Sequence, residues 1–137
     1  MKGFTANIEK DTLENKDFRK VLYTGKHLQL VLMSLKPGED IGEETHRNVD
    51  QFFSFESGSG KCIIDGNEYK LKAGTVIVVP AGAKHNIINN GDTKDLKLYT
   101  LYGPPNHQDG IVRVTKQDAQ KNAEKFDGKI TEKAVLQ

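Results

Sequence analysis

Short apolar runs separated by turn residues dominate the middle of this chain. The runs are rich in β-branched and aromatic residues and are too short for helices that bury a core. Turn signals lie between them, among them the tight Asp65-Gly66-Asn67 hairpin and Asn90-Gly91. We therefore expect strands over 21–23, 28–35, 51–55, 61–65, 68–71, 75–79, 85–88 and 96–102. Many short strands with frequent glycine-containing turns predict an all-β sandwich or barrel, of which the jelly roll is one form.

Helical patterns occur only near the two ends. Thr115 offers a side-chain cap, and Ala119, Ala123 and Phe126 then recur at i, i+4 and i+7. This spacing predicts a short C-terminal helix over 116–126, with an apolar stripe that packs on the outer face of the barrel or on a partner subunit. Gly128 ends it. A turn or two of helix is also expected within 11–18.

Length and charge set the broad class. A chain of 137 residues predicts a single domain, 1–137, with a barrel core at about 20–103 and a C-terminal loop and helix at about 104–128. A net charge of +1 without a basic run gives no reason to expect nucleic acid or an anionic membrane as a partner. The N-terminus lacks an apolar core of signal-peptide length, and no run is long enough to span a membrane, so we expect a cytoplasmic protein. Cys62 is the one cysteine, which we interpret as a buried structural thiol.

The most informative segment runs from Gly74 to Asn89. It reads as a strand, a tight turn at Pro80 and Gly82, and a second strand that opens on His85. Gly82 supplies the positive φ that such a turn often needs, and Pro80 fixes its entry. A histidine placed in this way points at one defined position instead of lying on a mobile loop.

The spacing Gly-x5-Pro-x-Gly-x2-His-x3-Asn is met at every position of that segment, and it resembles the second motif of the cupin superfamily. The first cupin motif is expected some twenty residues upstream, and its frame is present at Gly38, His46 and Gly58. Two positions depart from it, because Glu44 stands where the first histidine belongs and Gln51 where the glutamate belongs. The resemblance covers roughly 28–102 and implies a double-stranded β-helix, or jelly-roll barrel. The stretch from Leu96 to Gly110 resembles one seen in a branch of small single-domain cupins, cupin-2-like and often labelled sugar-isomerase-like.

The resemblance implies a metal site made of Glu44, His46, Gln51 and His85. Glu44 and His46 are two residues apart in an extended segment and so share a face, while Gln51 ends an inner row with Phe53 and Phe55. Two imidazoles, a carboxylate and an amide oxygen suit one divalent ion, which can be Fe, Mn, Ni, Co or Zn. Alone, Glu44 and His46 are each better read as surface residues. The alternative that the substituted site holds no metal and binds a ligand directly also remains.

Small pockets of this kind admit small molecules, and we expect this one to be lined by Phe53, Phe55, Ile87, Met33 or Leu32, and Tyr99. The first hypothesis is a metal-dependent enzyme on a small oxygenated metabolite, of the dioxygenase, isomerase or decarboxylase type, with Glu44 as candidate base. The alternative is a non-catalytic module that binds a sugar or an organic acid, and a structural role for the ion is a third possibility.

His107 and Asp109 follow the last strand on a loop that Pro104 and Pro105 turn away from it. The loop is either a lid that supplies a substrate contact or proton carrier, or simply an exposed segment, and the second reading is favoured. By resemblance to small cupins, and because edge strands need covering, we also expect a homodimer.

Overall fold

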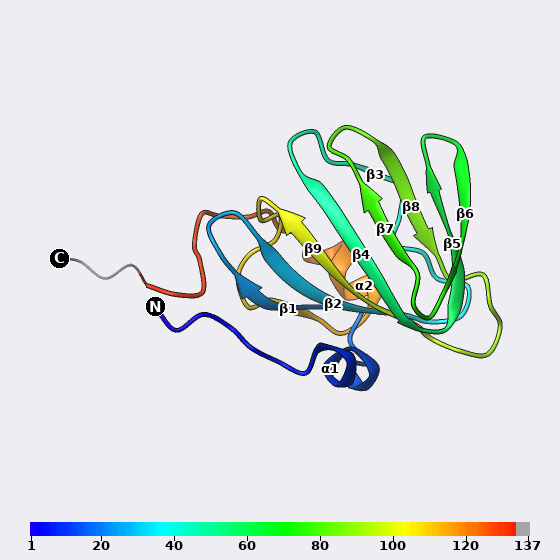
Figure 1. Ribbon diagram of the computed structural model, residues 1–137, viewed down its shortest axis with the longest axis horizontal. Helices are drawn as coiled ribbons and strands as arrows, with labels where there is room; N and C mark the ends of the chain where they lie inside the picture. Colours follow the sequence, from blue (N-terminus) through cyan, green and yellow to red (C-terminus); the bar gives the residue numbers. More distant parts are fainter. Residues whose placement is uncertain (134–137) are drawn as a thin grey trace.

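The computed structural model describes residues 1–133 and is built mainly from two antiparallel sheets (Figure 1). The larger sheet has six strands in the order β10-β1-β2-β9-β4-β7, and the smaller has four in the order β3-β8-β5-β6. In chain order the strands are β1 (Arg19–Thr24), β2 (Gln29–Leu35), β3 (Glu44–Thr45), β4 (Asp50–Ser57), β5 (Ser59–Ile64), β6 (Asn67–Lys72), β7 (Val76–Val79), β8 (Lys84–Ile88), β9 (Leu96–Gly103) and β10 (Val112–Arg113). The predicted all-β jelly-roll barrel is confirmed.

All eight predicted strands are present, and their ends lie within two residues of the prediction. The alternation of side chains explains this agreement, since β9 strictly alternates buried and half-buried residues from Leu96 to Gly103. The sequence analysis treated β3 only as an extended segment at Glu44 and His46, and it missed β10. Each has only two residues, too few for any periodic pattern.

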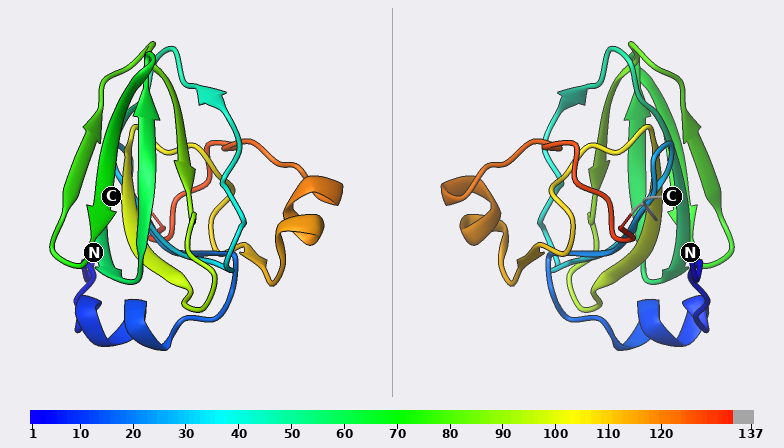
Figure 2. Two further views of the ribbon diagram at one scale, coloured as in Figure 1. Left: turned by 90° about the vertical axis from the view of Figure 1, so that its right-hand side faces the viewer. Right: turned by 90° about the vertical axis from the view of Figure 1, so that its left-hand side faces the viewer.

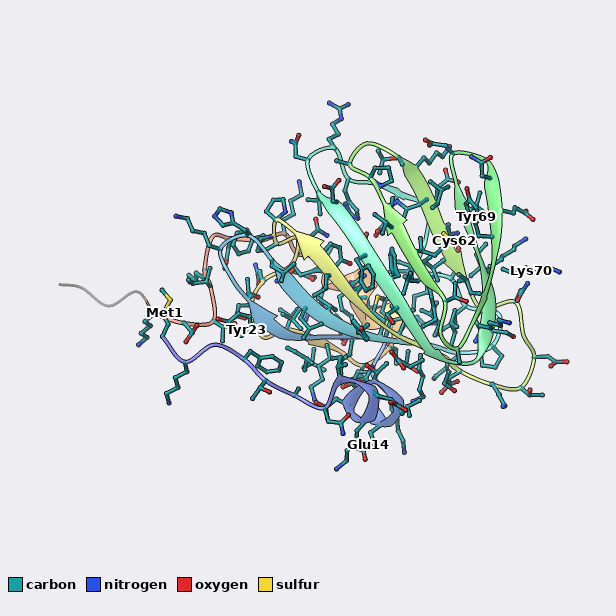
Figure 3. All side chains as sticks on the ribbon, viewed as in Figure 1. Met1, Glu14, Tyr23, Cys62, Tyr69 and Lys70 are labelled. Carbon is teal, nitrogen blue, oxygen red and sulfur yellow. The ribbon has the colours of Figure 1, made fainter. Side chains whose placement is uncertain are left out.

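The core lies between the two sheets (Figure 3). Its fully buried members come from both sheets and include Val31, Met33, Phe55, Cys62 and Ile87. Cys62 is a free, buried thiol, as expected, and burial raises its pKa to about 11. Its proton is therefore retained at neutral pH, and the thiol serves as a packed apolar side chain.

The first helix, α1 (Ile8–Glu14), begins earlier than predicted. The side chain of Asn7 caps it by accepting a hydrogen bond from the backbone N–H of Lys10, 3.2 Å away. The helix contacts β9 and β4 of the larger sheet and lies below it in the views of Figure 2. The predicted range 11–18 therefore lay too far toward the C-terminus, because the sequence analysis did not recognise Asn7 as the cap.

The second helix, α2 (Lys116–Lys121), is shorter than the predicted 116–126. Thr115 Oγ1 caps it as expected, accepting from Asp118 N at 3.0 Å. The helix ends at Asn122, whose amide group donates to Asp118 O at 3.0 Å and to Asp118 Oδ1 at 2.8 Å. Phe126 then donates its backbone N–H to Asn106 O, which draws the following segment away from a helical path.

The position of α2 also differs from the expectation. The helix stands on the side of the molecule where β3 lies (Figure 2), and Ala119 is buried there in the main core. Ala119 and Ala123 line a cavity beside Glu44, so the apolar stripe faces a cavity and not the outer face of the barrel. No helix within residues 1–133 is long and apolar enough to cross a membrane.

Candidate metal centre and adjoining cavity

His85 lies at the start of β8, where the preceding turn holds it firmly. Ala83 N–H donates to Pro80 O at 3.1 Å, and Gly82 takes a φ of 91°. The His85 ring is 4% exposed, and its Nδ1 lies 3.2 Å from the carbonyl of Ala83. Burial lowers the pKa of His85, so the ring is neutral, with Nδ1–H donating to Ala83 and Nε2 free to bind. A hydrogen bond of this kind orients metal-binding histidines.

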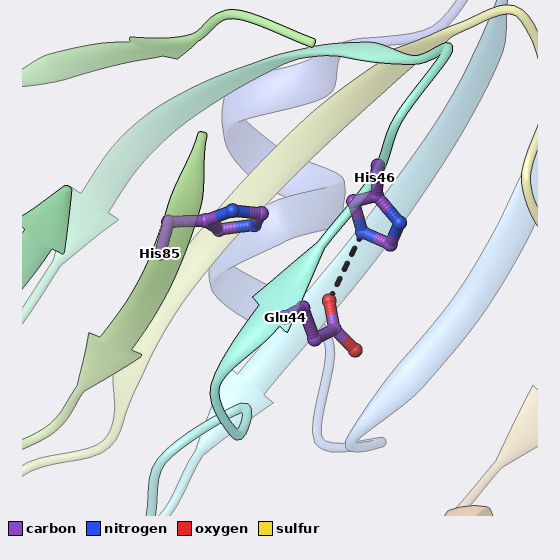
Figure 4. Close-up of side chains that lie close together, drawn as sticks. All are labelled: Glu44, His46 and His85. Atoms are coloured by element: carbon purple, nitrogen blue, oxygen red, sulfur yellow. Dashed lines mark hydrogen bonds and ion pairs between the residues drawn. The ribbon is translucent and has the colours of Figure 1, made fainter. Parts of the chain in front are cut away.

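Glu44 and His46 lie beside His85, on and just after the neighbouring strand β3. Glu44 on β3 pairs directly with His85 in the antiparallel register, and His46 follows two residues later. The carbonyl of His46 accepts a 2.8 Å hydrogen bond from Gly82 N, which joins this segment to the turn before β8. The three side chains therefore converge, and His46 Nε2 lies 3.1 Å from Glu44 Oε2 (Figure 4).

The three side chains form a cluster that could hold a metal ion. Each offers one ligand atom, and these atoms all lie within 4.8 Å of one another. Two imidazoles and one carboxylate suit first-row divalent ions, and three protein ligands leave positions open for substrate or water. The donor set and its spacing fit such an ion, while the ion's identity and the role of each ligand stay predictions.

Gln51, the fourth expected ligand, lies on the inner face of β4, as predicted, with Phe53 and Phe55. It is 2% exposed, and its Nε2 donates to Thr100 Oγ1 at 3.0 Å. Its carbonyl oxygen Oε1 is buried and has no hydrogen-bond partner among residues 1–133. A buried carbonyl without a partner is costly, so this oxygen fits a donor to an ion or to a bound water. Direct coordination by Gln51 stays a prediction.

Aromatic rings enclose the cluster. Ring centroids lie 5.5 Å apart for His46 and His85, 6.2 Å for Phe53 and His85, and 6.0 Å for His46 and Tyr102. The expected inner position of Tyr99 was wrong. Tyr99 lies beside Phe52 on the other face of the sheet, because inward residues of β9 have even numbers and Tyr102 is the inner tyrosine.

His107 is buried, which contradicts the favoured reading of an exposed loop histidine. Its Nε2 lies 3.1 Å from the Tyr102 hydroxyl, and its Nδ1 lies 2.9 Å from Glu124 Oε1. Burial, helped by the charge of nearby Arg19, lowers the pKa of His107 to about 3. The neutral ring then accepts from Tyr102 and donates to Glu124, and burial likewise raises the pKa of Tyr102.

The loop that carries His107 is fixed by Gln29 of β2. Gln29 Oε1 accepts from the backbone N–H groups of Asn106 and His107 at 3.0 and 2.9 Å, and Nε2 donates to His107 O at 2.8 Å. Asp109 lies apart from the site and accepts from Thr131 Oγ1 at 2.7 Å. The loop is therefore a fixed wall, and the sequence analysis missed its partners Gln29 and Glu124 because they come from distant parts of the chain.

A cavity of about 230 Å³ adjoins the cluster. Glu44 belongs to both, while Arg19, His107 and Glu124 contribute further polar groups to the cavity wall. The volume lies below the roughly 300–1,000 Å³ of drug-sized ligand pockets, so the space suits a small molecule. Arg19 could not be recognised from the sequence, since one basic residue at a strand end is ordinarily exposed.

Comparisons with known proteins agree with this architecture. The family model described as "Cupin domain" matches residues 31–102. Protein YrkC of Bacillus subtilis is 49% identical over 124 residues, which cover 86% of this chain and 66% of that protein. The chain thus spans slightly less than two thirds of that relative.

Two solved structures extend the agreement to three dimensions. The BH2720 protein of Bacillus halodurans has a TM-score of 0.86 at 40% identity, with 88% of this chain and 96% of that chain covered. A Thermotoga maritima protein described as a predicted oxalate decarboxylase has a TM-score of 0.55 at 26% identity, covering 58% of this chain and 68% of its own. With the family model matching more than half of its residues, the chain belongs to the cupin family.

Proposed function

We propose that the protein is a metal-dependent cupin enzyme that acts on a small oxygenated metabolite. The observation that carries the proposal is the shared position of Glu44, which belongs both to the His46 and His85 cluster and to the wall of the adjoining cavity. A small molecule in that cavity would lie beside Glu44 of the cluster. The Thermotoga maritima neighbour described as a predicted oxalate decarboxylase supports chemistry on a small oxygenated compound.

A divalent ion bound at this cluster would polarise a substrate carbonyl or bind dioxygen next to the substrate. The chain's own residues supply the rest. Phe53 and Tyr102 pack against the histidines and shield that side of the cluster from water, which strengthens electrostatic interactions there. Glu44 Oε2 faces His46, and the other oxygen, Oε1, forms no hydrogen bond within residues 1–133, so it is available to accept a proton from a substrate in the cavity.

The first test is the metal content of untagged protein by plasma mass spectrometry. We expect near-stoichiometric Fe, Mn, Ni, Co or Zn in the wild type and its loss in His85→Ala. His27→Ala serves as the matched control, because His27 is an exposed histidine of the turn between β1 and β2. Absence of metal in the wild type after incubation with divalent ions would contradict the proposal.

The second test separates an enzyme from a binding module. Metal-loaded protein is incubated with small 2-oxo acids, 2-hydroxy acids and aldoses, and product formation and dioxygen consumption are followed. Glu44→Ala should abolish turnover of any active compound. Binding of such a compound without turnover in the wild type, and its retention in Glu44→Ala, would favour the non-catalytic sugar- or organic acid-binding alternative.

A further inference from the structure

Arg19 is a buried cation whose charge has no partner in the described structure. It lies at the start of β1, 8% exposed, on the same inward face as Val21. Among residues 1–133 its guanidinium makes no hydrogen bond and no ion pair, and Nε is a buried donor without an acceptor. Its central carbon lies 5.3 Å from the centroid of the Phe18 ring.

The two carboxylates that line the cavity with Arg19, those of Glu44 and Glu124, are both engaged elsewhere. Glu124 accepts from Arg113, which is opposite Arg19 in the strand register, and also contacts His107. Glu44 faces His46 in the metal cluster, and Lys116, a further cation of the cavity wall, pairs with Asp40. The cavity wall therefore holds one guanidinium that lacks the anion that a buried charge requires.

We infer that Arg19 binds the carboxylate of the substrate in the cavity beside Glu44. A guanidinium presents two parallel N–H donors that match a planar carboxylate, and the bond is strong where water is excluded. Since Arg19 and Glu44 line the same cavity of about 230 Å³, one small molecule can contact Arg19 at one end and the metal cluster at the other. The substrate class is thus a small organic acid with a second oxygen group. This inference rests on the proposed function for the role of the cluster.

The inference also explains why the protein keeps a buried, unpaired Arg19 that lowers its stability. A buried, unpaired cation destabilises a fold, and residues retained in this state are commonly functional. If Arg19 instead had a structural role, its removal would destabilise the protein. The two roles therefore predict opposite signs for the effect of a neutral replacement on thermal stability.

Binding is tested with pyruvate and with hydroxyacetone, its neutral analogue that lacks the carboxylate, by titration calorimetry. Wild type and Arg19→Gln are compared with Lys20→Gln, which removes the same charge from the exposed neighbouring residue. Wild type and Lys20→Gln should both prefer pyruvate, while Arg19→Gln should bind it about tenfold to a hundredfold more weakly, as expected for the loss of charge-assisted hydrogen bonds. Thermal unfolding without ligand should show Arg19→Gln at least as stable as the wild type.

The same titrations in the His85→Ala background separate this inference from the proposed function. Pyruvate should still be preferred over hydroxyacetone when the metal cluster is broken, although more weakly. Equal pyruvate affinity in wild type and Arg19→Gln, or marked destabilisation of Arg19→Gln, would overturn the inference. Tighter binding of inorganic phosphate than of pyruvate would overturn the assignment to carboxylates. Absence of metal from the wild type together with an intact pyruvate preference would overturn the proposed enzyme and leave the anion site standing.

Discussion

The replacement Gln51→Glu tests whether Gln51 lies beside a bound metal ion. It restores the carboxylate usual at this corner of cupin sites, at a position that is 2% exposed. In the metal-free protein the new carboxylate has Thr100 Oγ1 as its near hydrogen-bond partner. A buried carboxyl group in such surroundings has a strongly raised pKa, and a rise of about two units costs about 3 kcal/mol of folding free energy above that pKa. For a chain of this length the melting temperature should fall by about 10 °C.

Zinc should reverse this effect, since the ion stabilises the adjacent carboxylate and binds the folded state selectively. The assay is thermal unfolding at about pH 8, with chelator and with excess Zn²⁺, for wild type and Gln51→Glu. The zinc-induced rise in melting temperature should be larger in the variant than in the wild type.

Gln29→Glu is the matched control. Gln29 is fully buried on the inner face of β2, and its side chain holds the Asn106–His107 backbone and lies outside the metal cluster. The Gln29→Glu variant should have a lower melting temperature than the wild type both with and without zinc. An equal zinc response in wild type and Gln51→Glu would refute the placement of Gln51 beside the ion, and an unchanged metal-free melting temperature would show that its oxygen reaches water.

Three further predictions concern the fold, the pH response and assembly. Gly58→Ala should lower the free energy of unfolding in urea more than Gly74→Ala. Both glycines have a positive φ (88° and 90°), where a side chain costs about 1–2 kcal/mol, but a Cβ at Gly58 would also lie 2.4 Å from Asp95 O, while the space at Gly74 is open. Equal losses in the two variants would contradict the clash. Because burial lowers the pKa of folded His107 to about 3, the unfolded chain takes up a proton on this ring first as the pH falls below about 6.5, and the free energy of unfolding should fall by up to about 1.4 kcal/mol per pH unit down to pH 3. In His107→Gln the free energy of unfolding should fall less steeply between pH 7 and 5. Equal slopes in the two proteins would count against a neutral buried ring. We propose a homodimer that covers the edge strand β7, where Val78 is 62% exposed. In analytical ultracentrifugation the wild type should then sediment as a dimer and Val78→Lys as a monomer. A monomeric wild type would contradict the dimer.

Local pattern was sufficient for much of this fold. The alternation along β9 and the hairpin at Asp65 and Gly66 are short-range features, so strands and turns could be located from the sequence. The placement of His85 after the Pro80 and Gly82 turn was likewise a local matter, because backbone geometry alone aims that side chain. Helix ends were less predictable, since Asn122 and the contact of Phe126 with Asn106 end α2 through particular hydrogen bonds.

The sequence by itself determined the strand pattern, the family frame and the residues His46, Glu44 and His85 of the cluster, since each depends on spacing along the chain. Only the tertiary structure decided what adjoins the cluster. Arg19 and Glu124 are far apart in sequence, and β1, β10 and the segment after α2 bring them to the same cavity. Whether a polar residue is buried, paired or left without a partner depends on such long-range neighbours. For that reason the burial of His107 and the unpaired charge of Arg19 have no signature in the sequence.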